Sequence, residues 1–475
     1  MNLSALLLVP IAGALVTALD PLRSRRQLWL VLTATVHLAL LVAAWSGRIG
    51  GSGLLWLSFD PLGGLVLTLV SVVFLAVTIY SIGYFRREAP RGTRAFEPCL
   101  LGFLAAATAV TLTDHFGVMW VAMEATTLAI APLIYDPHDR HSIEAVWKYL
   151  LICSVGIALA LLGTFMHALA QGMDVAMPSL SRSALVSART LQPVWLKAAF
   201  VFLFVGYGTK VGLVPMHTWL PDAHGEAPSP ISALLSGALL NCAFLAVLRV
   251  MQVAHAAGAD RVLAPVLVAF GLASMLVAGA LLLRQTNYKR MLAFSSIENM
   301  GILAVGCGLG GAATFGALLF MVGSSLCKAS LFFVAGNALI EYGSKRIADV
   351  SGLVRRLPIS GALLVLGFFA MTGAPPFAPF LGQIAILKGA MQAGRPWVAA
   401  AFLGLQIIVF IALAIRILGM AQGGSSNDVR RTESPWLLLP PAGLLGIVLA
   451  LGVSLMAPLQ RVLVAAVVTL GGGAP

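Results

Sequence analysis

Charged residues are scarce in this sequence. Asp, Glu, Lys and Arg together make up 10% of the 475 residues, whereas about 25% of a typical soluble domain is charged. Apolar residues make up 59%, and apolar runs recur from one end of the chain to the other. Many of these runs reach about 20 residues, the length that crosses a bilayer as a helix. We therefore expect an all-α polytopic membrane protein that lies in a lipid bilayer.

Cysteine is also rare, and its spacing excludes the sites that cysteines usually build. No pair has the CxxC spacing of a zinc or redox motif, and iron–sulfur clusters need sets of cysteine ligands. We expect no cofactor or metal in this chain and interpret the cysteines as small buried apolar residues. They are scattered through apolar runs at Cys99, Cys153, Cys242, Cys307 and Cys327.

The sequence has no polar stretch long enough for a soluble domain. The longest, roughly residues 171–193, excludes a soluble catalytic domain. The net charge of +12 comes mainly from basic residues in short loops between apolar runs. Such a distribution follows from membrane topology and gives no reason to expect nucleic acid binding.

The first apolar run lacks the preceding positive charge of a signal peptide. Arg23, Arg25 and Arg26 follow this run instead, which is typical of a first span with its N-terminus outside. Of the 30 lysine and arginine residues, 19 lie in the loops after odd-numbered spans. These loops are therefore predicted to be cytoplasmic, and both termini are predicted to face outward.

The apolar runs predict fourteen spans in four regions. Residues 1–97 hold the first three helices, 98–253 hold spans four to eight, 262–419 hold spans nine to thirteen, and 420–475 hold the last helix and a tail. The spans are predicted near residues 3–20, 28–46, 62–83, 98–113, 116–135, 147–170, 196–214, 229–253, 262–284, 291–309, 313–341, 359–389, 397–419 and 436–458.

Two spans are interrupted by glycine and proline. Span seven ends in Gly212–Pro215, and span twelve contains Gly373, Pro375 and Pro376. Proline removes a helical hydrogen bond and clashes with the preceding turn, so both helices are predicted to be broken. Broken helices at matching places indicate inverted repeats around an ion path. We expect spans four to eight and nine to thirteen to be two inverted five-helix repeats.

Glu124 and Lys210 are the two most unusual residues of the first predicted repeat. Both lie within apolar spans, where a charge costs about 2.5–3.5 kcal/mol on insertion scales. A structural interpretation is a neutral hydrogen-bonded acid at Glu124, or an ion pair that only holds helices together. A functional interpretation is a proton relay, because an acid and a base in low dielectric perturb each other's protonation strongly.

Three further charges are candidates for the same relay. Lys328 lies in the middle of span eleven. Glu298 is nearer the start of span ten and has an alternative location at the lipid headgroups. Lys148 is at the head of span six, where its long side chain can equally extend to the membrane interface. In the repeat alignment, Glu298 corresponds to Glu124.

The segment 215–230 has four titratable side chains and no lysine or arginine. We expect it to be a short cytoplasmic loop that forms a hydrated proton entrance, since histidine titrates near neutral pH. A metal site is the alternative, but the spacing matches no standard ligand pattern. The four residues are His217, Asp222, His224 and Glu226.

Two segments carry a resemblance to a known family. Residues 211–224, VGLVPMHTWLPDAH, and 285–296, QTNYKRMLAFSS, resemble signatures of the antiporter-like subunits of respiratory complex I and Mrp-type cation/proton antiporters. The resemblance covers roughly residues 60–420. Residues 217–230, 147–156 and 295–301 are most similar to the branch of hydrogenase-4 component F, in the formate hydrogenlyase group.

The resemblance implies roles and also shows two departures. Glu124 matches the family's span-five glutamate, Lys210 its span-seven lysine, and Lys328 a span-eleven lysine of some members. Ser236 stands where a span-eight His or Lys is common, and Gln383 where span twelve usually carries Lys or Glu. The resemblance leaves open whether Lys388, five residues beyond Gln383, takes over that role.

The resemblance also implies a function and partners. We expect a proton-translocating subunit in the bacterial inner membrane, bound to other membrane subunits and to a peripheral hydrogenase or dehydrogenase arm. Nickel–iron and iron–sulfur centres would belong to those partners. A cation/proton antiporter, a membrane partner of another soluble module, and a scaffold that does not pump remain alternatives.

Overall fold

In a computed structural model, the chain is described at residues 2–51, 54, 56–87, 94–135, 139–172, 178–188, 191–423 and 430–471. Helices form nearly all of these residues, and β-structure in them is limited to isolated bridges. The helices are α1 (Ser4–Leu19), α2 (Arg23–Trp45), α3 (Pro61–Arg87), α4 (Phe96–Leu112), α5 (Phe116–Ile134), α6 (Arg140–Leu169), α7 (Arg182–Ser187), α8 (Pro193–Val211), α9 (Trp219–Glu226), α10 (Ser229–Leu234), the π-helix η1 (Leu235–Leu239), α11 (Leu240–Ala256), α12 (Asp260–Leu282), α13 (Tyr288–Leu309), α14 (Gly311–Tyr342), the 3₁₀ turn η2 (Ile347–Asp349), α15 (Leu353–Arg356), α16 (Pro358–Met371), α17 (Ala378–Gln392), α18 (Pro396–Gln422), α19 (Pro435–Val453) and α20 (Ala457–Thr469).

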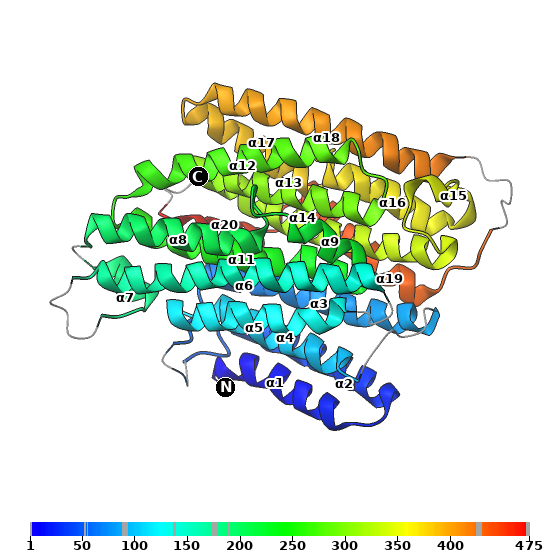
Figure 1. Ribbon diagram of the computed structural model, residues 1–475, viewed down its shortest axis with the longest axis horizontal. Helices are drawn as coiled ribbons and strands as arrows, with labels where there is room; N and C mark the ends of the chain where they lie inside the picture. Colours follow the sequence, from blue (N-terminus) through cyan, green and yellow to red (C-terminus); the bar gives the residue numbers. More distant parts are fainter. Residues whose placement is uncertain are drawn as a thin grey trace.

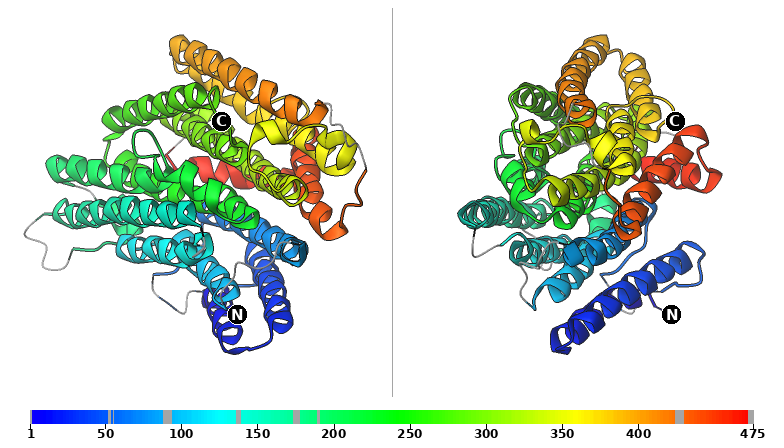
Figure 2. Two further views of the ribbon diagram at one scale, coloured as in Figure 1. Left: turned by 45° about the vertical axis from the view of Figure 1, so that its right-hand side comes forward. Right: turned by 90° about the vertical axis from the view of Figure 1, so that its right-hand side faces the viewer.

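Eleven of the described helical segments are long and apolar enough to cross a membrane. Three more of the predicted spans correspond to shorter apolar helices, namely α1, α4 and α16. The all-α polytopic class is therefore confirmed, while the number of fourteen spans stays a prediction. Most of the long helices lie side by side along one direction, with the hairpin of α1 and α2 at one edge and α18 at the opposite edge (Figures 1 and 2).

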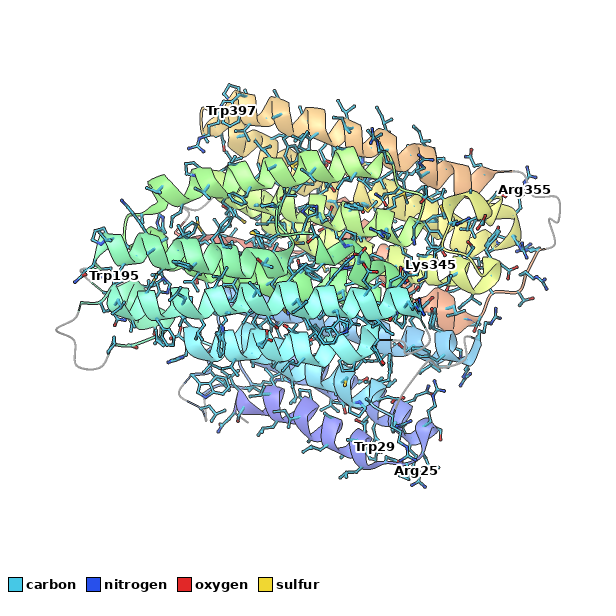
Figure 3. All side chains as sticks on the ribbon, in the orientation of Figure 1. Arg25, Trp29, Trp195, Lys345, Arg355 and Trp397 are labelled. Carbon is cyan, nitrogen blue, oxygen red and sulfur yellow. The ribbon has the colours of Figure 1, made fainter. Side chains whose placement is uncertain are left out.

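The helix ends define two ends of the molecule. Trp195 and Trp397 lie at one end, and Lys345 and Arg355 lie at the other (Figure 3). Arg25 lies on the side of Lys345, as expected for loops that follow odd-numbered spans. We call these the Trp195 end and the Lys345 end. Their assignment to the outside and the cytoplasm rests on the basic residues of the sequence.

Both predicted helix interruptions are present. The helix α8 ends at Val211, and Gly212 follows with a φ of 79°, a left-handed conformation that glycine adopts without a steric penalty. In the second half, α16 ends at Met371, and Gly373 has a φ of 76° before α17 begins. Each interruption ends the regular helical hydrogen bonding, so carbonyl groups of the last turn lack their helical partners.

The residues from 215 to 230 were expected to form a loop, and this prediction was wrong, while their cytoplasmic location stays a prediction. Half of the segment is the helix α9, and α10 begins at Ser229. Pro221 is tolerated because it lies in the first turn of α9, where its missing N–H has no helical acceptor. The indole N–H of Trp219 donates to the carbonyl of Thr209 over 2.8 Å, which ties α9 back to α8.

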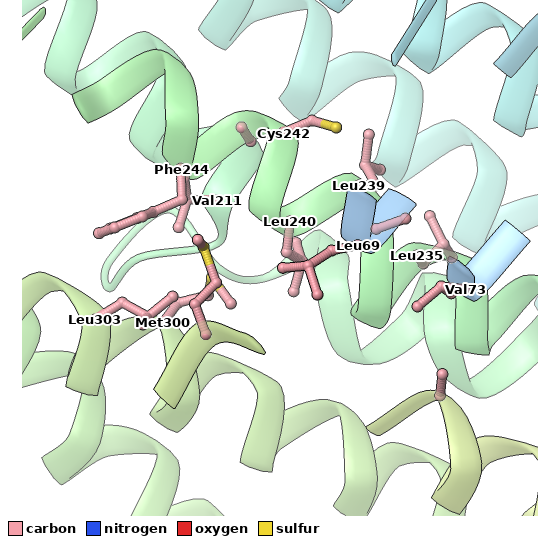
Figure 4. Packing of buried hydrophobic residues seen from close by; sticks show 14 of the residues in the cluster. Leu69, Val73, Val211, Leu235, Leu239, Leu240, Cys242, Phe244, Met300 and Leu303 are labelled. Atoms are coloured by element: carbon pink, nitrogen blue, oxygen red, sulfur yellow. The ribbon is translucent and has the colours of Figure 1, made fainter. Parts of the chain in front are cut away.

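The main apolar core extends over nearly all of the described helices, and the part next to the first interruption contains residues of α3, α8, α11 and α13. Figure 4 shows Val211 and Phe244 facing Met300 and Leu303, all of them buried. The π-helix η1 precedes α11 in this region and contains Ser236. A π-turn of this kind is rare and widens one turn of a helix, often at functional sites. Buried apolar side chains therefore surround the first interruption, and Ser236 is a polar residue among them.

Candidate functional site

Lys210 lies in the last turn of α8, immediately before the first interruption, and its side chain is fully buried. Its ammonium group donates to the hydroxyl of Thr127 on α5 and lies 3.4 Å from the hydroxyl of Tyr149 on α6. The Nζ atom is also 5.2 Å from the centre of the Tyr149 ring. Lys210 is thus held by hydroxyl groups and an aromatic ring of two neighbouring helices.

Glu124 lies one helical turn before Thr127. The Thr127 hydroxyl donates to Oε2 of Glu124 over 3.2 Å, and Ser154 on α6 donates to Oε1 over 2.9 Å. Within the described residues no ion pair joins Glu124 directly to Lys210. The sequence therefore indicated the right neighbours, and the structure adds the hydroxyl group that separates them.

A second buried lysine lies in the other half of the molecule. Lys328, in the middle of α14, donates to the hydroxyl of Ser295 and to the carbonyl of Leu292 at 3.3 Å, both on α13. Glu298 lies one turn beyond Ser295 and is almost completely buried. When the Asn299 amide is oriented with its nitrogen toward the acceptors, it donates to Glu298 Oε2 over 2.9 Å. The alternative location of Glu298 at the headgroups is wrong.

The surroundings of Lys210 and Lys328, the first and the second centre, are arranged alike but differ in one hydrogen bond. In both, a lysine binds a hydroxyl group that lies one turn from a glutamate on the same helix. The Thr127 hydroxyl donates to its glutamate, whereas the Ser295 hydroxyl donates to the carbonyl of Leu292 over 2.9 Å. A continuous hydrogen-bonded connection from lysine to glutamate is therefore present only in the first centre, among the described residues.

Ser236, one of the two departures from the family pattern, extends the second centre toward the first half. Its hydroxyl lies 2.8 Å from the hydroxyl of Ser296, which donates to the carbonyl of Leu292 over 3.0 Å. The same carbonyl accepts from Lys328. Sequence reasoning noted Ser236 only as a missing charge. Its hydroxyl instead belongs to a buried row of polar groups.

Gln383, the other departure, lies on the buried side of α17. Within the described part of the chain its side-chain nitrogen has no hydrogen-bond partner. Lys388 lies on the exposed side of the same helix, so its ammonium does not occupy the position of Gln383. The suggestion that Lys388 substitutes there finds no support in this arrangement.

Lys148 lies at the Lys345 end and is 43% exposed. Its ammonium pairs with Glu144 on the same helix at 2.6 Å and with Asp222 on α9 at 2.9 Å. Asp222 also pairs with Arg290 on α13 at 3.0 Å. These ion pairs join α6, α9 and α13 and place Lys148 at the surface, as the interfacial interpretation expected.

The other predicted entrance residues are separated from one another. Glu226 pairs with Lys345 at 2.6 Å at the same end of the molecule. His224 is fully buried, and its Nδ1 lies 2.9 Å from the carbonyl of Leu220. His217 lies in the interruption between α8 and α9. The four residues therefore do not form one hydrated loop.

Sequence reasoning missed Lys289, a buried lysine on α13 that donates to the carbonyl of Ala227 just after α9. It also missed an ionic cluster at the Trp195 end. Arg249 lies in the apolar run 229–253. It forms an ion pair with Asp60 through both guanidinium nitrogens Nη1 and Nη2, and the bond from Nη1 is 2.8 Å. Arg182 pairs with Asp114 at 2.8 Å. The isolated arginine within residues 229–253 was the available signal.

The carboxyl groups of this cluster have shifted pKa values. Burial alone would raise the pKa of Asp60, but the charge and hydrogen bonds of Arg249 outweigh burial and hold the pKa below its ordinary 3.8. For Asp114, burial is likewise outweighed, by hydrogen bonds from Ser181 and Ser183 and by the charge of Arg182, so its pKa is also lowered. Both groups are therefore ionised at neutral pH.

Buried lysines beside interrupted apolar helices are typical of membrane transport proteins. Residues 113–409 match the family model described as NADH:quinone oxidoreductase/Mrp antiporter, TM, and the chain belongs to this family.

Individual relatives agree with this assignment. The chain is 35% identical over 389 residues to a hydrogenase-4 component F homolog of Methylacidiphilum infernorum, covering 79% of this chain and 82% of the relative. It is 30% identical over 411 residues to NADH-quinone oxidoreductase subunit N of Desulforudis audaxviator, covering 84% and 81%. A chain of the archaeal membrane-bound sulfane sulfur reductase has the same fold, with a TM-score of 0.89 at 20% identity and coverage of 99% and 98%.

Proposed function

We propose that this chain is the proton-translocating membrane subunit of a redox complex of the hydrogenase-4 or complex I type. Family membership and the names of its relatives support the type of complex. The observation that carries the proposal is the continuous connection from Lys210 through Thr127 to Glu124. A buried base and a partly buried acid joined by a hydroxyl group have the parts that a proton relay needs.

The interrupted helix α8 supplies the means of changing this connection. Lys210 lies directly before Gly212, so a small movement at the interruption changes the position of the ammonium group. Moving the lysine away from the acid favours release of its proton, and moving it back favours uptake. Lys328, with Ser236 and Ser296, provides the next buried polar groups in the other half. In this proposal Glu298 is the second acid of the path.

The energy comes from partner subunits in this proposal. A peripheral hydrogenase or dehydrogenase arm would hold nickel–iron and iron–sulfur centres, because this sequence has no cysteine set for such clusters. The bacterial inner membrane would be the location. Gentle purification of the tagged chain identifies the arm: a nickel–iron hydrogenase subunit indicates the first type, and an NADH dehydrogenase module indicates the second.

The decisive experiment is Lys210→Met. The complex is expected to assemble and to transfer electrons from hydrogen or NADH, while proton uptake into inverted membrane vesicles falls to background. Normal proton uptake by this variant would contradict the relay. Sodium-dependent proton flux without any electron donor would instead indicate a cation/proton antiporter of the Mrp type, the second function that the family description includes.

A further inference from the structure

Among the described residues, Thr127 is the one that forms hydrogen bonds with both Lys210 and Glu124. It accepts a hydrogen bond from the lysine and donates one to Oε2 of the glutamate. The hydroxyl of Tyr149 lies 3.4 Å from the lysine Nζ, and the hydroxyl of Ser154 donates to Oε1 of the glutamate over 2.9 Å. Thr127 is fully buried. Its hydroxyl also lies 3.5 Å from the carbonyl of Met123, an acceptor farther away than Oε2 of Glu124 at 3.2 Å.

The chemistry of the three groups fixes the direction of the hydrogen bonds. A lysine ammonium has only donors, and a carboxylate has only acceptors. A hydroxyl group both accepts and donates, so it is the simplest group that satisfies a charged lysine and an ionised glutamate on opposite sides. A valine or alanine at this position would leave two charges apart with no group between them.

We propose that Thr127 transfers the proton between Lys210 and Glu124, an inference that rests on the function proposed above. An N–H bond of the ammonium breaks as an O–H bond forms at Thr127. The original O–H bond of Thr127 breaks as a new O–H bond forms on Oε2 of Glu124. The lysine and glutamate both become neutral, and Thr127 remains a hydroxyl group with one hydrogen.

The transfer leaves the hydroxyl group pointing the other way. Its hydrogen then lies toward the neutral amine of Lys210, which accepts it, and its oxygen accepts from the carboxylic acid of Glu124. Rotation of the Thr127 hydroxyl is therefore required before the next proton passes. Ser154 acts differently, because its hydrogen bond holds Oε1 of Glu124 and makes no contact with Lys210. It is a positioning residue.

Replacement of the hydroxyl group tests this inference. Thr127→Val has nearly the same shape and lacks the hydroxyl, and removing a proton-transfer group typically costs a factor of about 10²–10⁴. In inverted vesicles given hydrogen or NADH, the number of protons taken up per electron is expected to fall at least tenfold. Thr127→Ser restores the hydroxyl and is expected to keep most of the uptake.

Thr126 provides a matched control. It is adjacent, equally buried and on the same helix, but its hydroxyl donates to the carbonyl of Met123 over 2.6 Å and contacts neither charge. Thr126→Val is expected to leave uptake per electron unchanged. A tenfold loss in this control as well would attribute the effect to helix packing and overturn the inference.

The remaining outcomes separate this inference from the proposed function. Normal uptake in Thr127→Val together with none in Lys210→Met would overturn the role of Thr127 and leave the relay standing. Loss in both Thr127→Val and Thr127→Ser would show that a hydroxyl group at this position does not restore uptake, and would overturn the inference too. Thr127→Ala is the second variant if valine prevents assembly, and failure of both to assemble would make Thr127 a structural residue and overturn the inference.

Discussion

Lys210 and Glu124 are connected through a single hydroxyl group and do not form an ion pair with each other. A closed buried ion pair leaves a large penalty when either partner is removed, and so holds its charges in place. The intervening hydroxyl of Thr127 weakens that constraint while keeping the two groups in hydrogen-bonded contact. This arrangement suits a pair that must change its protonation rather than one that only joins two helices.

Lys328 and Lys388 allow a direct comparison of a buried and an exposed lysine in the second half. Lys328→Met removes the ammonium from the polar groups of α13 and is expected to reduce proton uptake per electron at least tenfold. Lys388→Met changes only an exposed side chain of α17 and is expected to have no effect. Measurements in inverted vesicles decide this. Equal uptake by both variants would remove Lys328 from the proposed path.

Arg249 is expected to contribute strongly to stability at the Trp195 end. Arg249→Met leaves Asp60 mostly buried without its principal partner, and breaking such a pair costs about 3–5 kcal/mol. Thermal unfolding of the purified protein is therefore expected at a clearly lower temperature. Arg48→Met, an exposed arginine near the same end, is the control and is expected to change little.

The pairing of Arg249 with Asp60 has its own check. If the destabilisation comes from an unpaired carboxylate, Asp60→Asn added to Arg249→Met should recover part of the loss. An additive loss in the double variant would contradict the pairing, since groups in direct contact are expected to show coupling.

The same end of the molecule is expected to lose stability in acid. The pKa values of Asp60 and Asp114 are lowered by folding, so their ionised forms stabilise the folded state above the ordinary value of 3.8. This stabilisation is lost as the pH falls through the lowered folded-state pKa values. Melting temperatures are expected to change little from pH 7 to 5 and to drop below about pH 4. Asp114→Asn should show a smaller drop; an unchanged drop would exclude this carboxyl group as a source.

The sequence predicts those features that depend on local signals. Glycine and proline at Gly212–Pro215 and at Gly373–Pro376 break a helix wherever it packs, so both interruptions were predicted correctly. Lys210 stands out because a charge in an apolar run is costly in any arrangement of helices. The same reasoning applies to Arg249, an isolated charge within residues 229–253.

Other features depend on which helices touch, and one sequence does not contain that information. The hydrogen bonds of Thr127 and Ser236 arise because α5 packs near α8 and η1 near α13. A threonine or serine in a span is otherwise unremarkable, since its hydroxyl commonly bonds its own helix. The helix α9 was missed because its histidines and acids have a loop-like composition, although Asp222 and Glu226 find ionic partners.

The second interruption is expected to require glycine at position 373. Its φ of 76° is unfavourable for other residues by about 1–2 kcal/mol. A Cβ atom there would also clash with Oε1 of Gln383, so that side chain would have to move. Gly394 has a similar φ of 66° but open space around it, so Gly394→Ala measures the backbone cost alone.

Gly373→Ala is therefore expected to lower the melting temperature more than Gly394→Ala. Adding Gln383→Ala to Gly373→Ala should bring the melting temperature close to that of Gly394→Ala. Equal effects of the two single variants would contradict the close contact between Gly373 and Gln383.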